Sequence, residues 1–358
     1  MKVKKLSGEN FRNLLPFSVE FCEETNVIYG NNAQGKTNLI EAIWLFTGAK
    51  SFRGAKDSEM VSFSGGTANL KMEFISGGIE NEAKISINAR RSAELNTKKL
   101  KSPSGLVGSF CATVFSPVDL GIIKEGPALR RRFLDLAIGQ LYPNYVNLLK
   151  EYTRALTQRN AVLKDMNGVL RDNNMLDIFE GELADKGEKI AKYRMESCKS
   201  LTVSASEIYS ELSSLREELE AVYMPSASED FLDLLYKARK TDIFSCTTSV
   251  GPHRDDLDFK INGISARTFG SQGQQRSIAI ALKLAEAKNL MQITGEEPVV
   301  IFDDVMSELD KSRQAFILNH IKDWQVFITC CDPSNIKGLE SGTVFQMEGG
   351  NFCNITVK

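Results

Sequence analysis

The segment of residues 30–37, with the sequence GNNAQGKT, constrains the fold of this chain more than any other feature. It fits the pattern G-x-x-x-x-G-K-[ST] of the loop that cradles the phosphates of ATP or GTP. Residues 25–29 before it read as a short buried strand, and residues 37–46 after it read as a helix with an apolar stripe. The order of strand, glycine-rich loop and helix separates a true P-loop from a chance match. The sequence therefore predicts a nucleotide-binding α/β domain.

Each residue type in this loop has a physical task. The glycines let the backbone bend so that successive N–H groups point at an anion, and the N-terminus of the following helix adds a partial positive charge. Lys36 supplies a full charge between the outer phosphates, and the Thr37 hydroxyl can ligate Mg²⁺. We therefore expect bound phosphates to contact the whole loop: Gly30, Asn31, Asn32, Ala33, Gln34, Gly35, Lys36 and Thr37.

Composition and charge narrow the class of protein. With 358 residues the chain can form one large domain plus a lobe, or two domains. A formal net charge of −2 means that nucleic-acid binding must come from local basic patches. No apolar run approaches the roughly 20 residues that cross a bilayer, and the N-terminus has no signal-peptide core. The seven scattered cysteines are typical of reduced thiols, so we expect a cytoplasmic protein without membrane contact.

Residues 297–304, with the sequence EPVVIFDD, predict a strand that ends in two carboxylates. Four apolar residues in succession indicate burial on both faces, as in a parallel sheet. A carboxylate at the C-terminal end of such a strand, beside a P-loop strand, typically holds the Mg²⁺ of the nucleotide. Asp303 is placed for that task, and Asp304 is placed to orient or deprotonate the attacking water. Because Thr37 and Asp303 lie far apart in the sequence, a large insertion must divide the two motifs.

Residues 269–277, with the sequence FGSQGQQRS, indicate another anion site at the start of an apolar helix over 278–290. A serine and glycines at a helix N-terminus offer free N–H groups and a helix dipole. Taken alone, the pattern favours an ordinary capped helix over a ligand site. Its position shortly before the Asp303 strand, with the sequence SELD at residues 307–310 after that strand, favours a phosphate site.

The chain resembles the ABC-type ATPases and, within them, the RecF family of bacterial recombinational repair proteins. The P-loop with the following Asn38, the signature loop at residues 271–276 and the Walker B strand at residues 301–304 match the ABC-type pattern. Motifs more particular to the RecF family are spread along the chain: residues 10–13 (NFRN), 115–120 (FSPVDL), 126–135 (GPALRRRFLD) and 251–256 (GPHRDD).

The resemblance implies an α/β fold, with an ABC-type P-loop ATPase core of mixed and antiparallel sheets around the P-loop helix and an inserted compact α-helical lobe. It implies ATP and Mg²⁺ as cofactors. Lys36, Asp303 and Asp304 would be catalytic, with Thr37 and Asp303 on the metal. The further nucleotide contacts that it implies are Arg12, Asn38, Ser271, Gly273 and Gln274.

Two departures from the ABC-type pattern imply a weak ATPase. Cys330 falls where many of these ATPases carry a histidine, and the position of the catalytic base holds Asp304 instead of the more usual glutamate. The shorter aspartate reaches less far toward the attacking water. We therefore expect slow hydrolysis that serves as a switch.

The spacing of apolar residues divides the chain into a head and an inserted lobe. Alternation typical of strands gives way to helical spacing from about residue 121. We expect residues 1–120 and 241–358 to form the ATPase head and residues 121–240 to form the lobe. Pro143, Gly168, Gly181 and Gly187 predict short, interrupted helices, which argues against a long coiled-coil arm.

A signature loop makes physical sense only with a second subunit. In the ATPases that this chain resembles, the signature serine of a partner chain closes the ATP site, because the γ-phosphate attracts a second helix N-terminus and ADP lacks that group. We therefore expect a head-to-tail homodimer that forms on ATP binding, with Ser271 and Gly273 facing the partner's phosphate. The resemblance further implies a clamp on double-stranded or gapped DNA that helps to load RecA recombinase with RecO and RecR, in DNA repair, replication restart and the SOS response.

No base-reading motif is present, so we expect DNA to be recognised by its backbone or shape. The candidate contacts are Lys50, Arg53, Lys56, Arg130, Arg131 and Arg132. Two alternatives stay open. One is the ATPase subunit of another complex, such as a membrane transporter, and the other is an ATP-gated protein scaffold without direct DNA contact.

Overall fold

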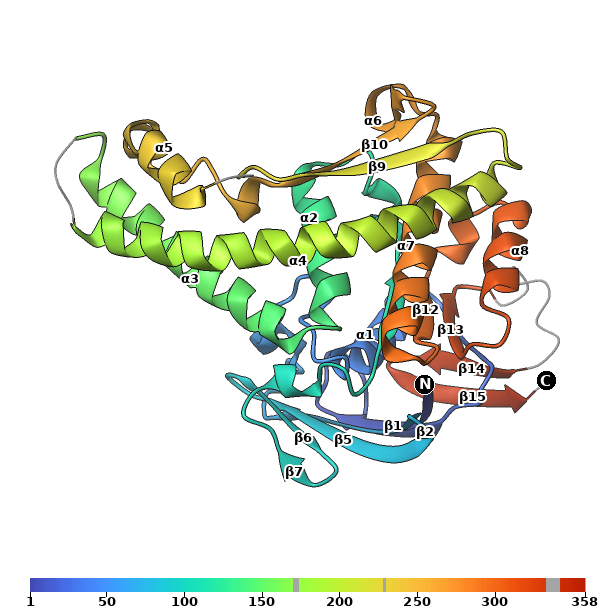
Figure 1. The fold of residues 1–358 in the computed structure, drawn as a ribbon. Coiled ribbons are helices and arrows are strands. Elements are labelled where there is room, and N and C mark those ends of the chain that lie inside the picture. The colour runs from blue at the N-terminus through green and yellow to red at the C-terminus, as the bar shows by residue number, and fades with distance from the viewer. Residues whose placement is uncertain (170–173, 228–229, 333–341, 358) are drawn as a thin grey trace.

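The computed structural model describes residues 1–169, 174–227, 230–332 and 342–357. Within them, the P-loop helix α1 (Lys36–Leu45) lies between two six-stranded β-sheets, and a third, three-stranded sheet lies on the far side of the long helices (Figure 1). One sheet is antiparallel, with the strand order β2-β1-β4-β5-β6-β7. Its strands are β1 (Lys2–Glu9), β2 (Phe17–Glu20), β4 (Ala68–Ser76), β5 (Ile79–Ile87), β6 (Arg91–Leu95) and β7 (Lys98–Lys99).

The second sheet contains the strands that precede the P-loop and Asp304. Its order is β15-β14-β3-β13-β12-β8, and every neighbouring pair is parallel except β14 and β15. Its strands are β3 (Thr25–Tyr29), β8 (Ala112–Phe115), β12 (Val299–Asp303), β13 (Val326–Cys330), β14 (Thr343–Glu348) and β15 (Asn351–Val357). The predicted parallel arrangement is confirmed, with β13 between β3 and β12. The carboxyl ends of parallel strands meet at one edge of a sheet, so the P-loop and Asp303 come together there.

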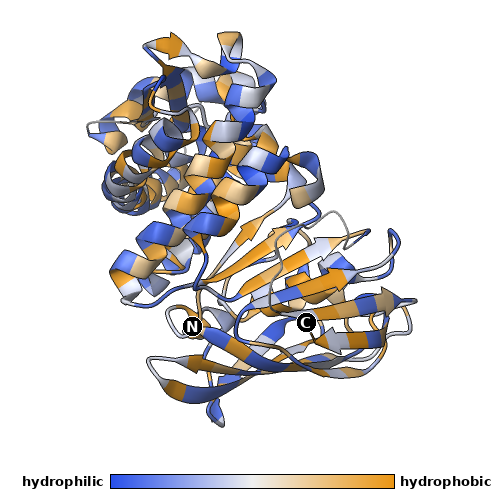
Figure 2. Ribbon diagram, turned by 90° about the vertical axis from the view of Figure 1, so that its right-hand side faces the viewer, coloured by the Kyte–Doolittle hydropathy of each residue, from blue (hydrophilic) through white to orange (hydrophobic). Residues whose placement is uncertain are grey.

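The strands of this sheet are apolar along their whole length because both faces are covered. Ile28 and Ile301 point into a core that contains Leu39 of α1 and extends to the antiparallel sheet. Their neighbours Val27 and Phe302 point the other way, into a core formed with the long helices. Figure 2 shows the resulting concentration of hydrophobic residues on these strands. Alternate side chains therefore fasten α1 on one face and the helices on the other.

The remaining helices come from the predicted lobe and from the segment around and after the signature loop. They are α2 (Pro127–Gly139), α3 (Pro143–Met166), α4 (Asn174–Leu212), α5 (Phe231–Ser245) and α7 (Gln272–Thr294), with the shorter α6 (Ala266–Phe269) and α8 (Lys311–His320) near the ends of α7 and β12. Short 3-10 helices lie at Asp57–Met60, Pro103–Leu106, Pro117–Gly121, Pro252–Arg254 and Met306–Glu308.

Helix α4 shows that the expectation of short, interrupted helices was wrong. It continues through Gly181 and Gly187 for 39 residues, which is about 58 Å at the rise of an α-helix. A Cβ at Gly187 would lie 2.4 Å from the ring of Phe231 at the start of α5, so this glycine permits close packing and does not end the helix. In Figure 1, α3 and α4 run together toward α5, as a helical hairpin that projects from the body.

A third, three-stranded sheet joins the lobe to the rest of the chain. Its order is β11-β10-β9, with β9 (Leu219–Met224), β10 (Asp256–Ile261) and β11 (Ile264–Ser265). The predicted boundary at residue 240 falls inside α5, and β9, from the predicted lobe, pairs with β10, from the predicted head. The division into head and lobe stays a prediction, with this sheet as the connection between its two parts.

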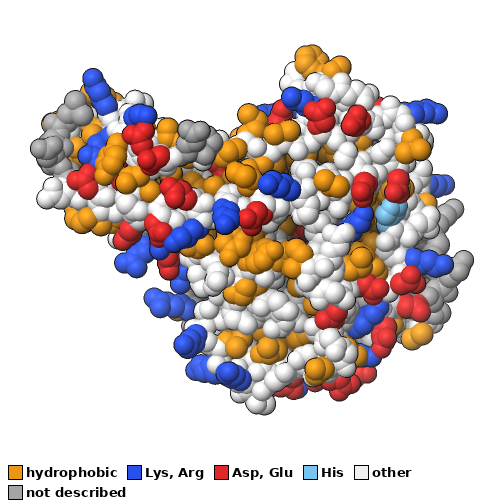
Figure 3. Space-filling view, in the orientation of Figure 1, with side chains coloured by type: hydrophobic (Ala, Val, Ile, Leu, Met, Phe, Trp, Pro, Cys, Tyr) orange, Lys and Arg blue, Asp and Glu red, His pale blue; other side chains and the backbone are white. Residues whose placement is uncertain are grey.

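None of the helices in the described ranges is long and apolar enough to cross a membrane. Figure 3 shows acidic and basic side chains interspersed over one face of the molecule, in keeping with the formal net charge of −2.

Candidate nucleotide site

Two glycines of the P-loop have backbone conformations and close neighbours that would strain any other residue. Gly30 has φ 155°, and a Cβ there would lie 2.2 Å from the Met347 carbonyl oxygen. Gly35 has φ 102° at the N-cap of α1, and a Cβ there would lie 2.7 Å from Leu14. These conformations turn the loop so that it passes directly into the helix N-terminus.

Further bonds tie the loop to its surroundings. The Asn38 amide donates to Asn13 Oδ1 (2.6 Å), and the Asn13 amide donates to the Ala33 carbonyl oxygen (3.1 Å). On the far side, Gln34 accepts hydrogen bonds from the backbone N–H groups of Gly349 and Gly350, in the turn between β14 and β15. Asn31, Asn32 and Ala33 are exposed at the outer turn of the loop. The loop is therefore held from two sides through Ala33 and Gln34, while residues 31–33 stay exposed.

Lys36 and Thr37 begin α1 with their side chains at the sheet edge. Lys36 is buried, and its Nζ donates to the carbonyl oxygens of Gly30 (2.8 Å) and Asn31 (3.1 Å). The Thr37 hydroxyl donates to Asp303 Oδ1 at 2.8 Å. Thus the structure brings together the predicted phosphate lysine, the predicted metal hydroxyl and the predicted metal carboxylate.

Asp303 and Asp304 share a partner that the sequence did not reveal. The Thr329 hydroxyl, on β13, donates to Asp303 Oδ1 (2.9 Å) and accepts from the Asp304 backbone N–H (2.9 Å). Burial raises the pKa of the Asp303 carboxyl, and the negative charge of Asp304 raises it further. Asp304 has φ 54°, a left-handed conformation that aspartate adopts more readily than glutamate. This backbone conformation gives a physical reason for the shorter acid at the base position.

The oxygen atoms of Thr37 and Asp303 fit the requirements of Mg²⁺. This ion takes one or two protein carboxylates or hydroxyls and completes its shell with phosphate oxygens and water. In the described part of the chain, no cluster of three or more His, Cys, Asp or Glu side chains could hold a metal by itself. The pair at α1 and β12 therefore suits a cation that arrives with a nucleotide.

Arg12 is joined to α1 by an ion pair with the buried Glu41. Its guanidinium donates twice to Glu41 Oε2 (2.7 and 2.9 Å) and once to the Glu59 carbonyl oxygen. Glu41 is fully buried and also accepts from the Ser51 hydroxyl. Glu41 was not among the predicted site residues, although a lone carboxylate on an otherwise apolar helix indicates a buried cation partner.

The adjacent cysteines at the end of β13 differ in exposure. Cys330, the residue at the expected histidine position, is buried, and burial raises the pKa of its thiol to about 12. Cys331 is exposed, with its Sγ donating to Asn32 Oδ1 (3.1 Å) and lying 4.0 Å from Lys36 Nζ. Cys331, and not Cys330, is therefore the thiol beside the P-loop.

The signature loop, residues 271–276, forms the capped N-terminus of α7. Ser271 is exposed at the N-cap of α7, where its hydroxyl oxygen accepts from the Gln274 N–H (3.2 Å). The Gln274 side-chain oxygen accepts in return from the Ser271 N–H (2.8 Å), completing a capping box. From the side of residues 307–310, Arg313 of α8 donates to the Gly273 carbonyl oxygen (3.0 Å). The free N–H groups of this turn leave an anion-binding helix start at the surface.

The two halves of the predicted site do not meet inside one chain. Among the described residues, no hydrogen bond joins residues 271–274 to residues 30–37. In Figure 1 the start of α7, next to α6, lies at the top of the molecule, and α1 lies below it near the sheets.

The candidate DNA contacts divide into buried and exposed groups. Arg130 is 2% exposed and forms an ion pair with Asp256 (2.6 Å), and it also donates to carbonyl oxygens of the preceding turn. Its burial contradicts the expectation that it contacts DNA. Arg131 is half-buried and donates to the Asp255 carbonyl oxygen (2.7 Å). Lys50, Arg53 and Lys56 are exposed.

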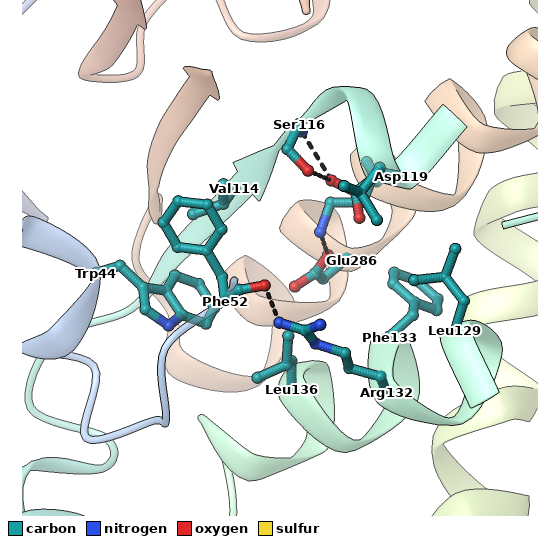
Figure 4. Close-up of a pocket in the computed structure, with 12 residues that line it drawn as sticks. Trp44, Phe52, Val114, Ser116, Asp119, Leu129, Arg132, Phe133, Leu136 and Glu286 are labelled. Atoms are coloured by element: carbon teal, nitrogen blue, oxygen red, sulfur yellow. Dashed lines mark hydrogen bonds and ion pairs between the residues drawn. The ribbon is translucent and has the colours of Figure 1, made fainter. Parts of the chain in front are cut away.

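Arg132 also faces the protein. It lines a pocket between the end of α1, the end of β8, α2 and α7 (Figure 4). Its guanidinium donates to the Phe52 carbonyl oxygen, and the buried ion pair of Lys283 and Glu286 lies across the pocket. No P-loop residue lines this pocket. Arg132 therefore serves packing between α2 and the segment after α1.

Comparisons with known proteins agree with this arrangement. The AAA ATPase domain family matches residues 1–250. The chain is 37% identical over 360 residues to the DNA replication and repair protein RecF of Clostridium perfringens, across 98% of this chain and 99% of that protein. It is 39% identical over 357 residues to the RecF protein of Caldanaerobacter subterraneus subsp. tengcongensis, across 94% and 96%.

Solved structures give the same result. The recombination mediator protein RecF-ATPrS of the RecFOR pathway superimposes with a TM-score of 0.90 and 37% identity, over 98% of this chain and 97% of that one. An Smc head domain from Pyrococcus furiosus, 16% identical with a TM-score of 0.53, shares the fold alone. With this sequence identity along its whole length and this structural match, the chain belongs to the RecF family of DNA replication and repair proteins.

Proposed function

We propose that this protein binds ATP with Mg²⁺, dimerises head to tail on ATP binding, and acts in the cytoplasm as a weak ATPase that clamps DNA. The observation that carries the proposal is the meeting of Lys36, Thr37 and Asp303 at one sheet edge, while Ser271 is exposed on a separate helix start. One half of a phosphate site is thus complete in each chain, and the other half faces outward.

The residues of one chain would act on the phosphates together. Lys36 and the first N–H groups of α1 would bind the outer phosphates, and Thr37 and Asp303 would hold Mg²⁺, which neutralises phosphate charge when bound. Asp304 would orient or deprotonate the attacking water. Ser271 and Gly273 of a second copy would contact the same phosphates, with Asn38 and Arg12 supporting the loop from behind.

Ser271 is suited to this contact by its own hydrogen bonding. Its oxygen accepts from the Gln274 N–H, so its hydroxyl proton stays available to donate to a phosphate oxygen. Loss of the γ-phosphate would remove the charge that attracts this second helix N-terminus, and the dimer would open.

The DNA role is proposed from family membership and from the exposed cations. Relatives are described as DNA replication and repair proteins and as a recombination mediator in the RecFOR pathway. By analogy, this chain would bind double-stranded or gapped DNA and help to load RecA with RecO and RecR, in repair, replication restart and the SOS response. Lys50, Arg53 and Lys56 would contact DNA phosphates without reading bases.

A gel-shift titration with ATP, ADP and a non-hydrolysable ATP analogue, repeated over a salt series, tests the clamp. We expect tight binding with ATP and its analogue, weak binding with ADP, and affinity that falls linearly on a log–log plot against salt. Lys322→Ala, an exposed lysine outside the candidate patch, serves as the control for Lys50→Ala and Lys56→Ala. Equal binding with ADP and ATP would contradict the proposal.

The ATP-gated scaffold without DNA contact stays as a second candidate, because the inward position of Arg130, Arg131 and Arg132 removes half of the candidate cations. Nucleotide-dependent dimers that fail to shift any duplex or gapped DNA, even at low salt, would favour the scaffold.

A further inference from the structure

The signature loop is joined to the helical lobe by a chain of three side chains, which we call the Glu217 bridge. Gln274, in the first turn of α7, donates through Nε2 to Glu217 Oε1 at 2.7 Å. Tyr209, near the end of α4, donates through its hydroxyl to Glu217 Oε2 at 2.5 Å. Glu217 lies between α4 and β9, so the bridge links the lobe's long helix to the loop that carries Ser271.

The bridge fixes which way the Gln274 amide points. An ionised carboxylate only accepts hydrogen bonds, so the Gln274 nitrogen must face Glu217. The Gln274 oxygen then faces the Ser271 backbone N–H, the bond that completes the capping box (2.8 Å). Without Glu217, a flipped amide would place two donors against that N–H. Glu217 therefore decides whether the box can close.

The carboxylate is itself held in place. Tyr209 is 1% exposed, and burial, with the bond to Glu217, raises the pKa of its phenol, so it stays a donor. The Glu217 backbone N–H donates to the Ser213 hydroxyl, and the Ser213 hydroxyl lies within reach of the Glu217 carbonyl oxygen. The central member of the bridge, Glu217, is thus anchored in the turn after α4.

We propose that Glu217 is a positioning residue for the ATP site formed between two copies of the chain. By orienting Gln274, it holds the Ser271 cap in the form that meets the partner's phosphates. This inference rests on the proposed head-to-tail dimer. Glu217 touches no nucleotide in this arrangement and acts only through Gln274.

The test compares Glu217→Ala, Glu217→Gln and Glu220→Ala in the full chain. Glu220 is an exposed glutamate on β9 and serves as the matched control. The amide that Glu217→Gln introduces can still accept from Gln274 and can donate to the Tyr209 oxygen, so this variant should rescue the geometry. Two measurements are made, one of the nucleotide-free chain and one with ATP.

Amide hydrogen exchange without nucleotide reports on the loop directly. In Glu217→Ala we expect the Ser271 and Gln274 amides to exchange about tenfold faster, the effect of losing roughly one charge-assisted hydrogen bond. Amides in the buried middle of α7, such as Ala281, should be unchanged and show that the variant is folded. Unchanged exchange at Ser271 would overturn the inference.

Sedimentation with saturating ATP reports on the composite site. We expect the dimer dissociation constant to rise about tenfold in Glu217→Ala and to stay within about twofold of wild type in Glu217→Gln and Glu220→Ala. ATP affinity of the monomer should be the same in all of them. Faster exchange with unchanged dimerisation would also overturn the positioning role. If wild type itself stayed monomeric with ATP, the proposed dimer would fail, and the exchange data would still decide whether Glu217 holds the loop.

Discussion

The P-loop and the signature loop are two phosphate-directed helix starts that are supported in different ways. The P-loop joins the central parallel sheet to α1, and much of its fixation comes from backbone groups, such as the carbonyl oxygens that bind Lys36 and the N–H groups that bind Gln34. The signature loop lies at the surface and is fixed by side chains of other elements, Glu217 on one side and Arg313 on the other. The first support is built into the core, whereas the second can be altered by single side chains near the surface.

The largest effect, on ATP affinity, is expected from removing the positive charge of Lys36 in the P-loop. Lys36→Ala should weaken ATP binding about a thousandfold, because in the proposed site the lysine would make charge-assisted contacts with phosphate from a buried position. Fluorescence titration with a labelled ATP analogue measures the affinity. Lys322→Ala should bind ATP like wild type. Near-normal affinity in Lys36→Ala would mean that the P-loop half is not the primary binding half.

The next largest effect, on ATP hydrolysis, is expected at Asp304, the proposed general base. Asp304→Asn should slow hydrolysis about 100-fold, the usual contribution of a general base, while ATP-bound dimers accumulate. Asparagine tolerates the left-handed backbone of this position, so the fold should be unaffected. Phosphate release measures turnover, with Asp323→Asn on the surface as the control. Turnover at the wild-type rate would reject Asp304 as the base.

A substitution at the signature serine should leave ATP binding intact and weaken dimerisation. Ser271→Arg should bind ATP as a monomer, with a dimer dissociation constant raised about 50-fold, because a bulky cation replaces the cap in a tightly packed contact. Mixing two different variants gives a stricter test of the composite site. A chain carrying Lys36→Ala still presents an intact Ser271, so together with a Ser271→Arg chain it restores one complete site. Recovery of dimers in the mixture, and in neither variant alone, is the expected result by sedimentation.

The smallest expected effect is a gain in the free energy of unfolding when Asp303, the proposed metal ligand, is replaced. The pKa of Asp303 is raised in the folded chain, so the folded state holds this proton more tightly than the unfolded state. Stability from this group is therefore present at low pH and is lost as the pH rises through the raised pKa. Asp303→Asn should stabilise the nucleotide-free protein by about 1 kcal/mol at pH 7, while ATP hydrolysis is lost.

Urea unfolding of both proteins at several pH values checks this prediction. The difference should shrink as the pH falls toward the ordinary aspartate value of 3.8. A destabilised Asp303→Asn protein at pH 7 would show that the hydrogen bonds from Thr37 and Thr329 outweigh the cost of burial.

The same contrast explains what the sequence could predict. The P-loop, its strand and helix, and the strand that ends at Asp303 were predictable because each chemical task is encoded in consecutive residues. Glu217 and Glu41 were not, since each acts through a partner distant in the sequence. Only the fold brings such pairs together.

Two further misjudgements have simple geometric reasons. Arg130, Arg131 and Arg132 are consecutive on α2 and point about 100° apart, yet each finds its own partner within the protein: the Asp256 carboxylate, the Asp255 carbonyl oxygen and the Phe52 carbonyl oxygen. Glycines normally weaken a helix, but Gly187 is retained within α4 because Phe231 packs against it. In both cases tertiary packing, and not local propensity, decided the outcome.

Helix α4 runs unbroken from the far end of the helical hairpin to Tyr209, the first member of the Glu217 bridge. A continuous helix that packs against α7 and β9 would couple a tilt of the hairpin to the position of the signature loop. Reciprocity then follows from thermodynamic linkage. A protein that binds the hairpin more tightly in the dimer than in the monomer must strengthen dimerisation by the same factor. Dimerisation on ATP binding must, in turn, raise the affinity for that protein by the same factor.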